Sequence, residues 1–143
     1  MLRISVIDDD SLVLSMMRRS LRLFGFEVDC HSSAAAFFWH LDPERLPDLI
    51  FCDVVMPQMS GIELYRRLAA QVGDRRPPFV FTTAHELTGE LEAVLAADPG
   101  LLLLKKPFQL AQLRRLIHDQ FGTRLRYAPQ HTFSQKALVL EYE

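Results

Sequence analysis

Short apolar runs alternate with amphipathic stretches through residues 1–121, and this alternation limits the folds that the chain can adopt. The strand-like runs are Ile4–Ile7, Glu27–His31, Leu49–Cys52, Phe79–Thr82 and Leu101–Leu104. Apolar residues at helical spacing follow each run, over Ser11–Phe24, Ala34–Leu41, Gly61–Ala70, Leu87–Leu95 and Leu110–Phe121. Parallel strands need such helical connections, so the pattern predicts one α/β domain whose five-stranded parallel sheet carries helices on both faces.

The overall composition is that of an ordinary globular domain. Of the 143 residues, 49% are hydrophobic and 24% are charged, and the net charge of −2 gives no reason to expect nucleic acid or an anionic membrane as a partner. No apolar stretch approaches the roughly 18 residues of a membrane span, and no secretory signal is visible. Cys30 and Cys52 form no metal-binding or redox pattern. We therefore expect reduced thiols and a cytoplasmic location.

The last segment, Gly122–Glu143, does not continue the alternation. It is too short to build a second domain with its own core. We expect either a C-terminal tail or the start of a truncated output region. No helix-turn-helix pattern fits within it, so we do not expect the chain to bind DNA directly.

Polar residues stand at the ends of four of the predicted strands. Asp8, Asp9 and Asp10 follow the first strand and Asp53 follows the third, while Thr83 and Lys106 follow the fourth and fifth. In a doubly wound sheet these carboxyl ends meet at one edge, where ligand crevices lie. Carboxylates brought close together repel unless a cation joins them, and oxygen ligands suit Mg²⁺. Acids, hydroxyl and ammonium together indicate phosphoryl transfer, with one carboxylate available as nucleophile.

The local contexts of these residues resemble the receiver domain of two-component response regulators. The similarity covers about residues 2–121 and rests on four segments in the family's order: Val6-Ile7-Asp8-Asp9-Asp10, Asp53-Val54-Val55-Met56-Pro57-Gln58-Met59-Ser60-Gly61, Thr82-Thr83-Ala84 and Lys105-Lys106-Pro107-Phe108. The resemblance implies a flavodoxin-like (βα)5 fold with a doubly wound parallel sheet. Helices cover both faces of this sheet and give three layers, α/β/α. It also implies a signalling domain rather than an enzyme.

By this resemblance, Asp53 accepts a phosphoryl group from the phosphohistidine of a sensor kinase or phosphotransfer protein. The metal ligands would be Asp8, Asp9, Asp53 and the backbone carbonyl of Val55, and the backbone of Val54 and Ala84 would contact the phosphoryl group. Thr83 matches the switch hydroxyl, and Lys106 matches the lysine that meets the phosphoryl group, with a cis bond to Pro107. A change of the partner-binding surface would carry the signal.

Three neighbouring residues have simpler interpretations. We expect Asp10 to face solvent or to cap the first helix, with Ser11 as the competing cap. Lys105 is expected on the surface, because Lys106 is the lysine that precedes proline. Side chains alternate along a strand, so Thr82 is expected in the core or on a flank while Thr83 points to the site.

The chain departs from the family at the fifth strand. Receivers commonly have Tyr or Phe three residues before the lysine, and here that position is Leu103. The four leucines Leu101–Leu104 are most simply a strand covered on both faces. If Leu103 instead faces outward, it adds an apolar patch beside Arg114, Arg115 and His118, and the face from the fourth to the fifth helix would bind a partner or a second copy.

Two further positions bear on how long a phosphoryl group lasts. In the family, the residues two places after the phosphorylated aspartate and after the switch hydroxyl tune hydrolysis, and here they are Val55 and His85. Valine cannot orient a water molecule by hydrogen bonding. We therefore expect slow self-dephosphorylation.

Two other functional classes compete with this interpretation. In a haloacid-dehalogenase-like phosphohydrolase, Asp8 would be the nucleophile and Asp10 the acid/base, but Asp53 would then have no role. In a receiver-like interaction module without phosphate cycling, the acidic residues would be retained without accepting phosphate.

Overall fold

The computed structural model describes residues 1–122, which form an alternating βα chain. The strands are β1 (Arg3–Ile7), β2 (Glu27–His31), β3 (Leu49–Asp53), β4 (Phe79–Thr83) and β5 (Leu101–Lys105). The helices are α1 (Ser11–Leu23), α2 (Ala34–His40), α3 (Gly61–Val72), the 3-10 turn η1 (Gly73–Arg75), α4 (Gly89–Ala97) and α5 (Leu110–Phe121). The domain boundary expected near residue 121 and the tail lie largely outside the described residues.

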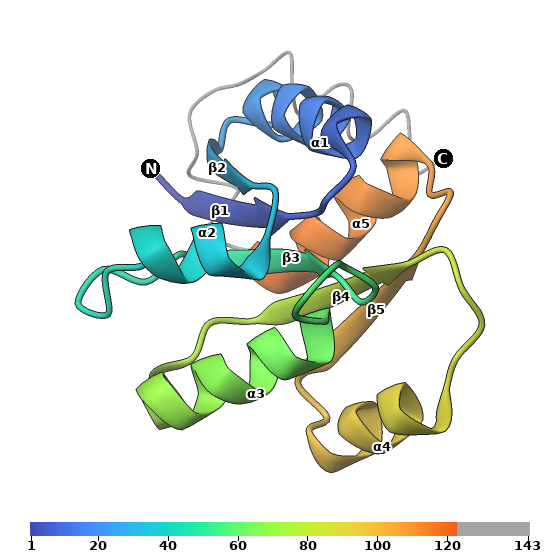
Figure 1. The fold of residues 1–143 in the computed structure, drawn as a ribbon. Coiled ribbons are helices and arrows are strands. Elements are labelled where there is room, and N and C mark those ends of the chain that lie inside the picture. The colour runs from blue at the N-terminus through green and yellow to red at the C-terminus, as the bar shows by residue number, and fades with distance from the viewer. Residues whose placement is uncertain (123–143) are drawn as a thin grey trace.

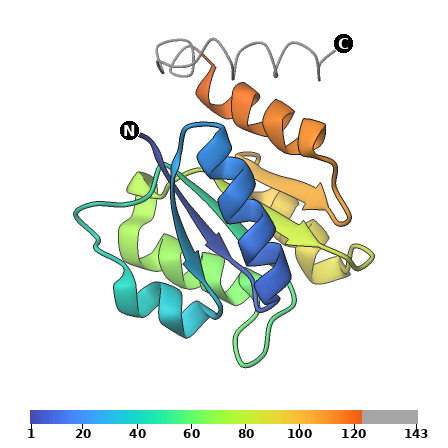
Figure 2. The ribbon, with the colours of Figure 1, turned by 90° about the horizontal axis from the view of Figure 1, so that it is seen from above.

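All five strands pair in parallel in one sheet, in the order β2-β1-β3-β4-β5. Figure 1 shows α1 and α5 on one face of this sheet and α2, α3 and α4 on the other. Figure 2 looks down on the face that carries α1 and α5. The predicted flavodoxin-like, doubly wound, three-layer fold is confirmed. The order reverses direction beside β1, so the carboxyl ends of β1 and β3 stand next to each other at the switch point.

Each face of the sheet has its own hydrophobic core, because strand side chains alternate between the faces. In β3, Ile50 and Cys52 belong to the core beneath α2, α3 and α4, whereas Leu49 and Phe51 belong to the core beneath α1 and α5. All five residues of β3 are buried. A strand covered on both faces reads as a continuous apolar run, which is why β3 shows no polar alternation before Asp53.

Capping side chains set where the helices begin. Asp10 accepts a hydrogen bond from the Leu12 N–H at 2.9 Å, which confirms it, rather than Ser11, as the cap of α1. Thr88 caps α4 by accepting from the Leu91 N–H at 3.2 Å. As a result α4 starts at Gly89, two residues later than the apolar spacing predicts, and Leu87 lies in the preceding loop.

A polar clasp closes the edge of the sheet opposite to the carboxyl ends of the strands. Asp98, at the C-terminal end of α4, accepts hydrogen bonds from the Tyr65 hydroxyl and from Arg76, the latter at 3.2 Å, and its other oxygen accepts from the Gly100 N–H at 2.9 Å. The Tyr65 ring packs edge-on against Phe79, with 5.2 Å between ring centroids. The clasp therefore ties α3, the approach to β4 and the α4–β5 turn together.

Two surface features complete the description. Trp39 in α2 has 85% of its surface exposed, although tryptophan is usually well covered. Among the described helices, none has the length and apolar character required to traverse a bilayer.

Candidate functional site

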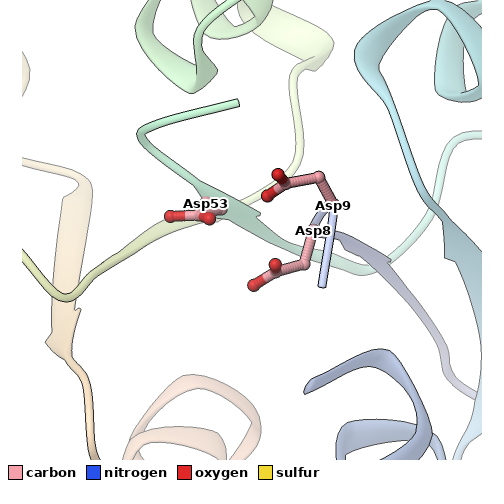
Figure 3. Close-up of side chains that lie close together, drawn as sticks. All are labelled: Asp8, Asp9 and Asp53. Atoms are coloured by element: carbon pink, nitrogen blue, oxygen red, sulfur yellow. The ribbon is translucent and has the colours of Figure 1, made fainter. Parts of the chain in front are cut away.

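Three carboxylates from two neighbouring strand ends converge at the carboxyl edge of the sheet. Asp8 and Asp9 directly follow β1, and Asp53 is the last residue of β3. One oxygen of each lies within 4.8 Å of the others. Figure 3 shows the three side chains close together, with the carboxylates of Asp8 and Asp9 pointing to the side on which Asp53 lies. Asp8 is 1% exposed and Asp53 is 8% exposed, whereas Asp9 is open to solvent, so the cluster has a buried floor and an accessible rim.

Lys106, which follows β5, brings a positive charge into this cluster. Its Nζ lies 2.6 Å from Asp8 Oδ2 and 3.5 Å from Asp53 Oδ2. The other Asp8 oxygen accepts a hydrogen bond from the Asp10 N–H at 2.9 Å. The Lys106–Pro107 bond is cis, as the resemblance implied. Sequence reasoning assigned Lys106 to the phosphoryl group and did not predict that Asp8 would be its nearer partner.

Burial and crowding shift the protonation equilibria of the site. Burial, followed by the charge of Asp8, raises the pKa of Asp53 above its ordinary value of 3.8, and this outweighs the opposing effect of Lys106. Burial lowers the pKa of Lys106, but the hydrogen bond to Asp8 and the charge of Asp53 leave it above its ordinary value. Burial also raises the pKa of Cys52 well above normal, so this thiol stays protonated. Lys106 therefore remains a cation beside carboxylates that repel each other.

The loop from β3 to α3 depends on a glycine for its path. A Cβ atom on Gly61 would lie 2.2 Å from the Asp53 carbonyl oxygen and 3.0 Å from the Asp53 carbonyl carbon. The Gly61 N–H donates to the Val54 carbonyl at 2.9 Å, which holds the start of α3 against the end of β3. This confirms that the glycine permits close backbone approach. The position of the Asp53 backbone thus rests on a residue eight places further along.

The two backbone N–H groups that follow Asp53 have different partners. The Val54 N–H donates to the Thr82 carbonyl at 3.0 Å and so continues the sheet. The Val55 N–H instead donates to the Asp53 carboxylate. The strand pairing therefore persists one residue beyond β3, and the expected contact of the Val54 backbone with a phosphoryl group stays a prediction. The phosphoryl contact expected of the Ala84 backbone and the metal ligand expected at the Val55 carbonyl remain predictions.

Both threonines at the end of β4 are buried. Thr83 Oγ1 accepts a hydrogen bond from the His85 N–H at 3.1 Å, and the Thr83 carbonyl accepts from the Lys106 N–H at 2.8 Å. Thr82 lines a small pocket on the other face of the sheet, together with Asp8 and Phe108. In this structure the Thr83 hydroxyl therefore holds the β4–α4 loop. Lys105 is exposed, as predicted.

The leucines of β5 are covered on both faces, as predicted. Leu101 and Leu103 pack against the core beneath α3 and α4, whereas Leu102 and Leu104 pack against the core beneath α1 and α5. Leu103 pairs with Phe81 in the β4–β5 register. It lies on the face opposite to α5, so it does not form the alternative apolar patch with Arg114, Arg115 and His118.

The donor set at the carboxyl edge fits a hard divalent cation. Three carboxylate oxygens lie close enough to share one ion, and hard cations such as Mg²⁺ prefer oxygen ligands. The ammonium of Lys106 already balances part of this negative charge at Asp8. No other group of three such ligand atoms meets the same distance limit within residues 1–122.

Comparisons with known proteins agree with this geometry. A family profile of the response regulator receiver domain matches residues 4–118. The response regulator protein TmoT of Ectopseudomonas mendocina is 36% identical over 129 residues, which cover 89% of this chain and 54% of TmoT. Other curated relatives are likewise about twice as long as the matched region, so the chain spans about half of their length.

Solved structures show the same relationship. The response regulator receiver protein from Burkholderia phymatum is 35% identical, with a TM-score of 0.71, and the match covers 85% of this chain and 96% of that one. The receiver domain of the sensor histidine kinase PA1611 from Pseudomonas aeruginosa PAO1 is 28% identical, with a TM-score of 0.71 and coverage of 85% and 98%. That structure has a magnesium ion coordinated in its active site cleft.

The chain belongs to the response regulator receiver domain family, the signalling domains of two-component systems. The haloacid-dehalogenase alternative is not favoured. It would make Asp8 the nucleophile, yet both oxygens of Asp8 are engaged, by Lys106 and by the Asp10 N–H.

Proposed function

We propose that Asp53 is the phosphoacceptor of this receiver, with Asp8 and Asp9 as metal ligands and Lys106 as the cation that meets the phosphoryl group. The observation that carries the proposal is the convergence of the three carboxylates and the Lys106 ammonium at one edge of the sheet. The Asp53 carboxylate accepts a hydrogen bond from the Val55 N–H. It also lies near Lys106, but at 3.5 Å it is not the nearer partner of that ammonium.

The reaction is a phosphoryl transfer between two protein side chains. An Asp53 carboxylate oxygen attacks the phosphorus of a phosphohistidine, the P–N bond breaks, and the imidazole of the donor leaves and takes up a proton. The raised pKa of Asp53 reflects a carboxylate whose charge is poorly compensated in the resting protein. Lys106 would move from Asp8 toward the new phosphoryl oxygens. The move would be short, because Lys106 Nζ already lies 3.5 Å from Asp53 Oδ2.

Mg²⁺ is the cofactor that we propose for this site. Bound there, it would neutralise charge on the phosphoryl oxygens and on the clustered acids. Asp8, Asp9 and Asp53 would hold it, together with the Val55 carbonyl. The magnesium ion in the PA1611 receiver supports the assignment, because that domain shares both fold and 28% of its sequence with this chain.

Val55 supports a long-lived phosphoryl group. Its side chain is 53% exposed at the mouth of the site and has no hydrogen-bonding group with which to orient an attacking water. Replacement by Asn is expected to accelerate loss of the phosphoryl group. Equal lifetimes for the wild type and Val55→Asn would contradict this assignment.

A histidine kinase or a phosphotransfer protein is the proposed donor, and the proposed location is the cytoplasm, which the free thiols of Cys30 and Cys52 support. The partner that this domain binds to pass on the signal is also a proposal. Leu103 adds no apolar patch to the face from α4 to α5, so a partner or a second copy bound there would contact other side chains of these helices. Light scattering with and without beryllofluoride tests the dimer, and a monomer in both states would exclude it.

The phosphoacceptor is tested by Mg²⁺-dependent labelling with acetyl phosphate, followed by mass spectrometry. The wild type should gain one phosphoryl group on Asp53, and Asp53→Asn should gain none. Asp10→Asn is the matched control, because asparagine also caps helices and Asp10 points to α1 rather than to the cluster. Labelling of Asp8 would instead identify a phosphohydrolase, and no labelling at all would indicate an interaction module that does not cycle phosphate.

A further inference from the structure

Two histidines face each other across a cleft that lies apart from the acidic cluster. His31 ends β2 and His40 ends α2, and their ring centroids are 5.4 Å apart, with ring planes inclined by 32°. Both line a cleft of about 280 Å³ between the sheet and α2. The charged side chains that line the same cleft balance formally, since they are Arg3, Asp29, Asp42 and Arg45. A cation placed there would therefore meet no net positive charge.

The spacing of the two imidazoles suits a shared metal ion. A tetrahedral Zn²⁺ bound by two ring nitrogens at about 2.0 Å sets the ring centroids about 5 Å apart. The 5.4 Å between His31 and His40 is close to this value. Imidazole ligands suit Zn²⁺, Cu²⁺ and Ni²⁺, whereas carboxylate oxygens suit Mg²⁺. The two sites of the molecule thus differ in the class of metal that their donors prefer.

Neighbouring groups fix the positions of both rings. His40 Nδ1 lies 2.8 Å from the Ala36 carbonyl oxygen, so Nδ1–H donates there and Nε2 is the ring nitrogen left for a metal ion. A backbone carbonyl is a typical outer partner of a metal-binding histidine. The His31 ring packs edge-on against Phe37, with centroids 5.7 Å apart.

The remaining ligands of such an ion would come from solvent. Within residues 1–122 no third histidine, cysteine or carboxylate atom completes a compact group with this pair. Asp29 is bound by Arg3 at 2.7 Å, and Asp42 accepts a hydrogen bond from the Glu44 N–H at 2.9 Å. Two imidazoles and water describe an exchangeable site rather than a closed structural one.

We propose that His31 and His40 form a second metal site, which takes a Zn²⁺-type transition-metal ion through two imidazole nitrogens and water. The site joins α2 to the end of β2. The His31 carbonyl also accepts the Asp8 N–H at 3.1 Å, so an ion held by His31 would be one hydrogen bond away from the acidic cluster. This inference is independent of the phosphoacceptor proposal.

The test uses Zn²⁺ as the probe and the full chain in saturating Mg²⁺, which occupies the acidic cluster. Calorimetry should detect one Zn²⁺ site, and ¹⁵N-imidazole NMR should show the His31 and His40 rings shifting together. His40→Gln should weaken Zn²⁺ binding at least about tenfold, since loss of a ligand costs no less than loss of its outer partner. His40 is exposed, so this variant retains the fold. His85→Gln replaces another exposed histidine and should bind Zn²⁺ like the wild type.

Three results would overturn the proposal: equal Zn²⁺ affinity in His40→Gln and the wild type, displacement of the bound Zn²⁺ by Mg²⁺, or a shift of only one of the two rings. His31→Gln should reproduce the loss seen with His40→Gln. Beryllofluoride modification of Asp53 in the His40→Gln variant should persist. The two proposals therefore fail separately.

Discussion

The two edges of the sheet use aspartate in opposite ways. At the carboxyl edge, Asp53 is buried beside other carboxylates, and its pKa is raised. At the opposite edge, the Tyr65 hydroxyl, the Gly100 N–H and Arg76 donate hydrogen bonds to Asp98, and its pKa is lowered. The same side chain is electrostatically strained at one edge and satisfied at the other.

The difference separates a site for chemistry from a device for stability. A group whose charged form is disfavoured in the folded protein weakens folding when it ionises, while a satisfied group strengthens folding. Functional sites concentrate perturbed groups of the first kind. The Tyr65–Asp98–Arg76 clasp, in contrast, joins three elements and lies across the sheet from the acids. Removing the charge of Asp53 should therefore raise stability, whereas removing a hydrogen-bond donor from Asp98 should lower it.

The largest effect is expected at the backbone of the acidic edge. Gly61→Ala places a methyl group against the Asp53 carbonyl and should cost about 3 kcal/mol of unfolding free energy. It should also reduce phosphorylation of Asp53. Urea unfolding measures the first effect. Gly89→Ala is the control, because a Cβ there meets nothing within 4 Å, and a wild-type stability for Gly61→Ala would contradict the close approach.

Mg²⁺ should relieve the strain at the acidic edge. At about ten times its Kd, Mg²⁺ should stabilise the wild type by about 1.4 kcal/mol through selective binding to the folded state. The same concentration should stabilise Asp53→Asn less, because one of the three converging carboxylates is missing. The comparison uses thermal melts in buffer with Mg²⁺ and in metal-free buffer that contains a chelator. Equal Mg²⁺ shifts in both proteins would place the ion elsewhere.

Without metal, Asp53→Asn should raise stability by about 1 kcal/mol at neutral pH, since it removes one of three like charges in close proximity. A raised pKa means that the favourable contribution of Asp53 is present below its ordinary value of 3.8 and is lost as the pH rises through its folded-state pKa. The advantage of the variant should therefore be absent in acid and grow with pH. Urea unfolding across this range checks the trend, which a pH-independent difference would refute.

The smallest effect is expected at the opposite edge, with a sign opposite to that of Asp53→Asn. Tyr65→Phe keeps the ring on Phe79 but removes the hydroxyl from Asp98, and it should cost about 0.5 kcal/mol, because Arg76 and the Gly100 N–H remain as partners. A lowered pKa means that the contribution of Asp98 is present above 3.8 and is lost as the pH falls through its folded-state pKa. The cost should accordingly shrink in acid, and phosphorylation should be unchanged. A gain in stability at neutral pH would break the contrast between the edges.

Local patterns were sufficient to predict most of the fold. The bounds of β2 match the prediction because its polar and apolar residues alternate, and the start of α3 at Gly61 was also predicted. The start of α4 was missed because the apolar spacing begins at Leu87, whereas the helix begins where the Thr88 cap satisfies its first N–H groups. The strand order came only from the structure, since helical crossovers of similar length permit several orders.

The site was predicted as a set of residues but not as a set of contacts. Strand-end acids and Lys106 can be identified along the chain because the carboxyl ends of parallel strands share an edge. Which acid Lys106 prefers depends on side-chain reach across three strands, and local sequence does not encode it. The same holds for Val55, whose N–H faces Asp53 because strand pairing ends one residue later than the apolar run indicates.

The exposure of Trp39 has a practical consequence for anyone who studies this receiver by optical methods. It is the only tryptophan in the sequence, and it stands in solvent on α2, next to His40. Its intrinsic fluorescence will therefore be a poor reporter of phosphate or magnesium at Asp53. Paramagnetic ions such as Cu²⁺, which quench nearby indoles, turn the same side chain into a built-in sensor for the neighbouring histidines.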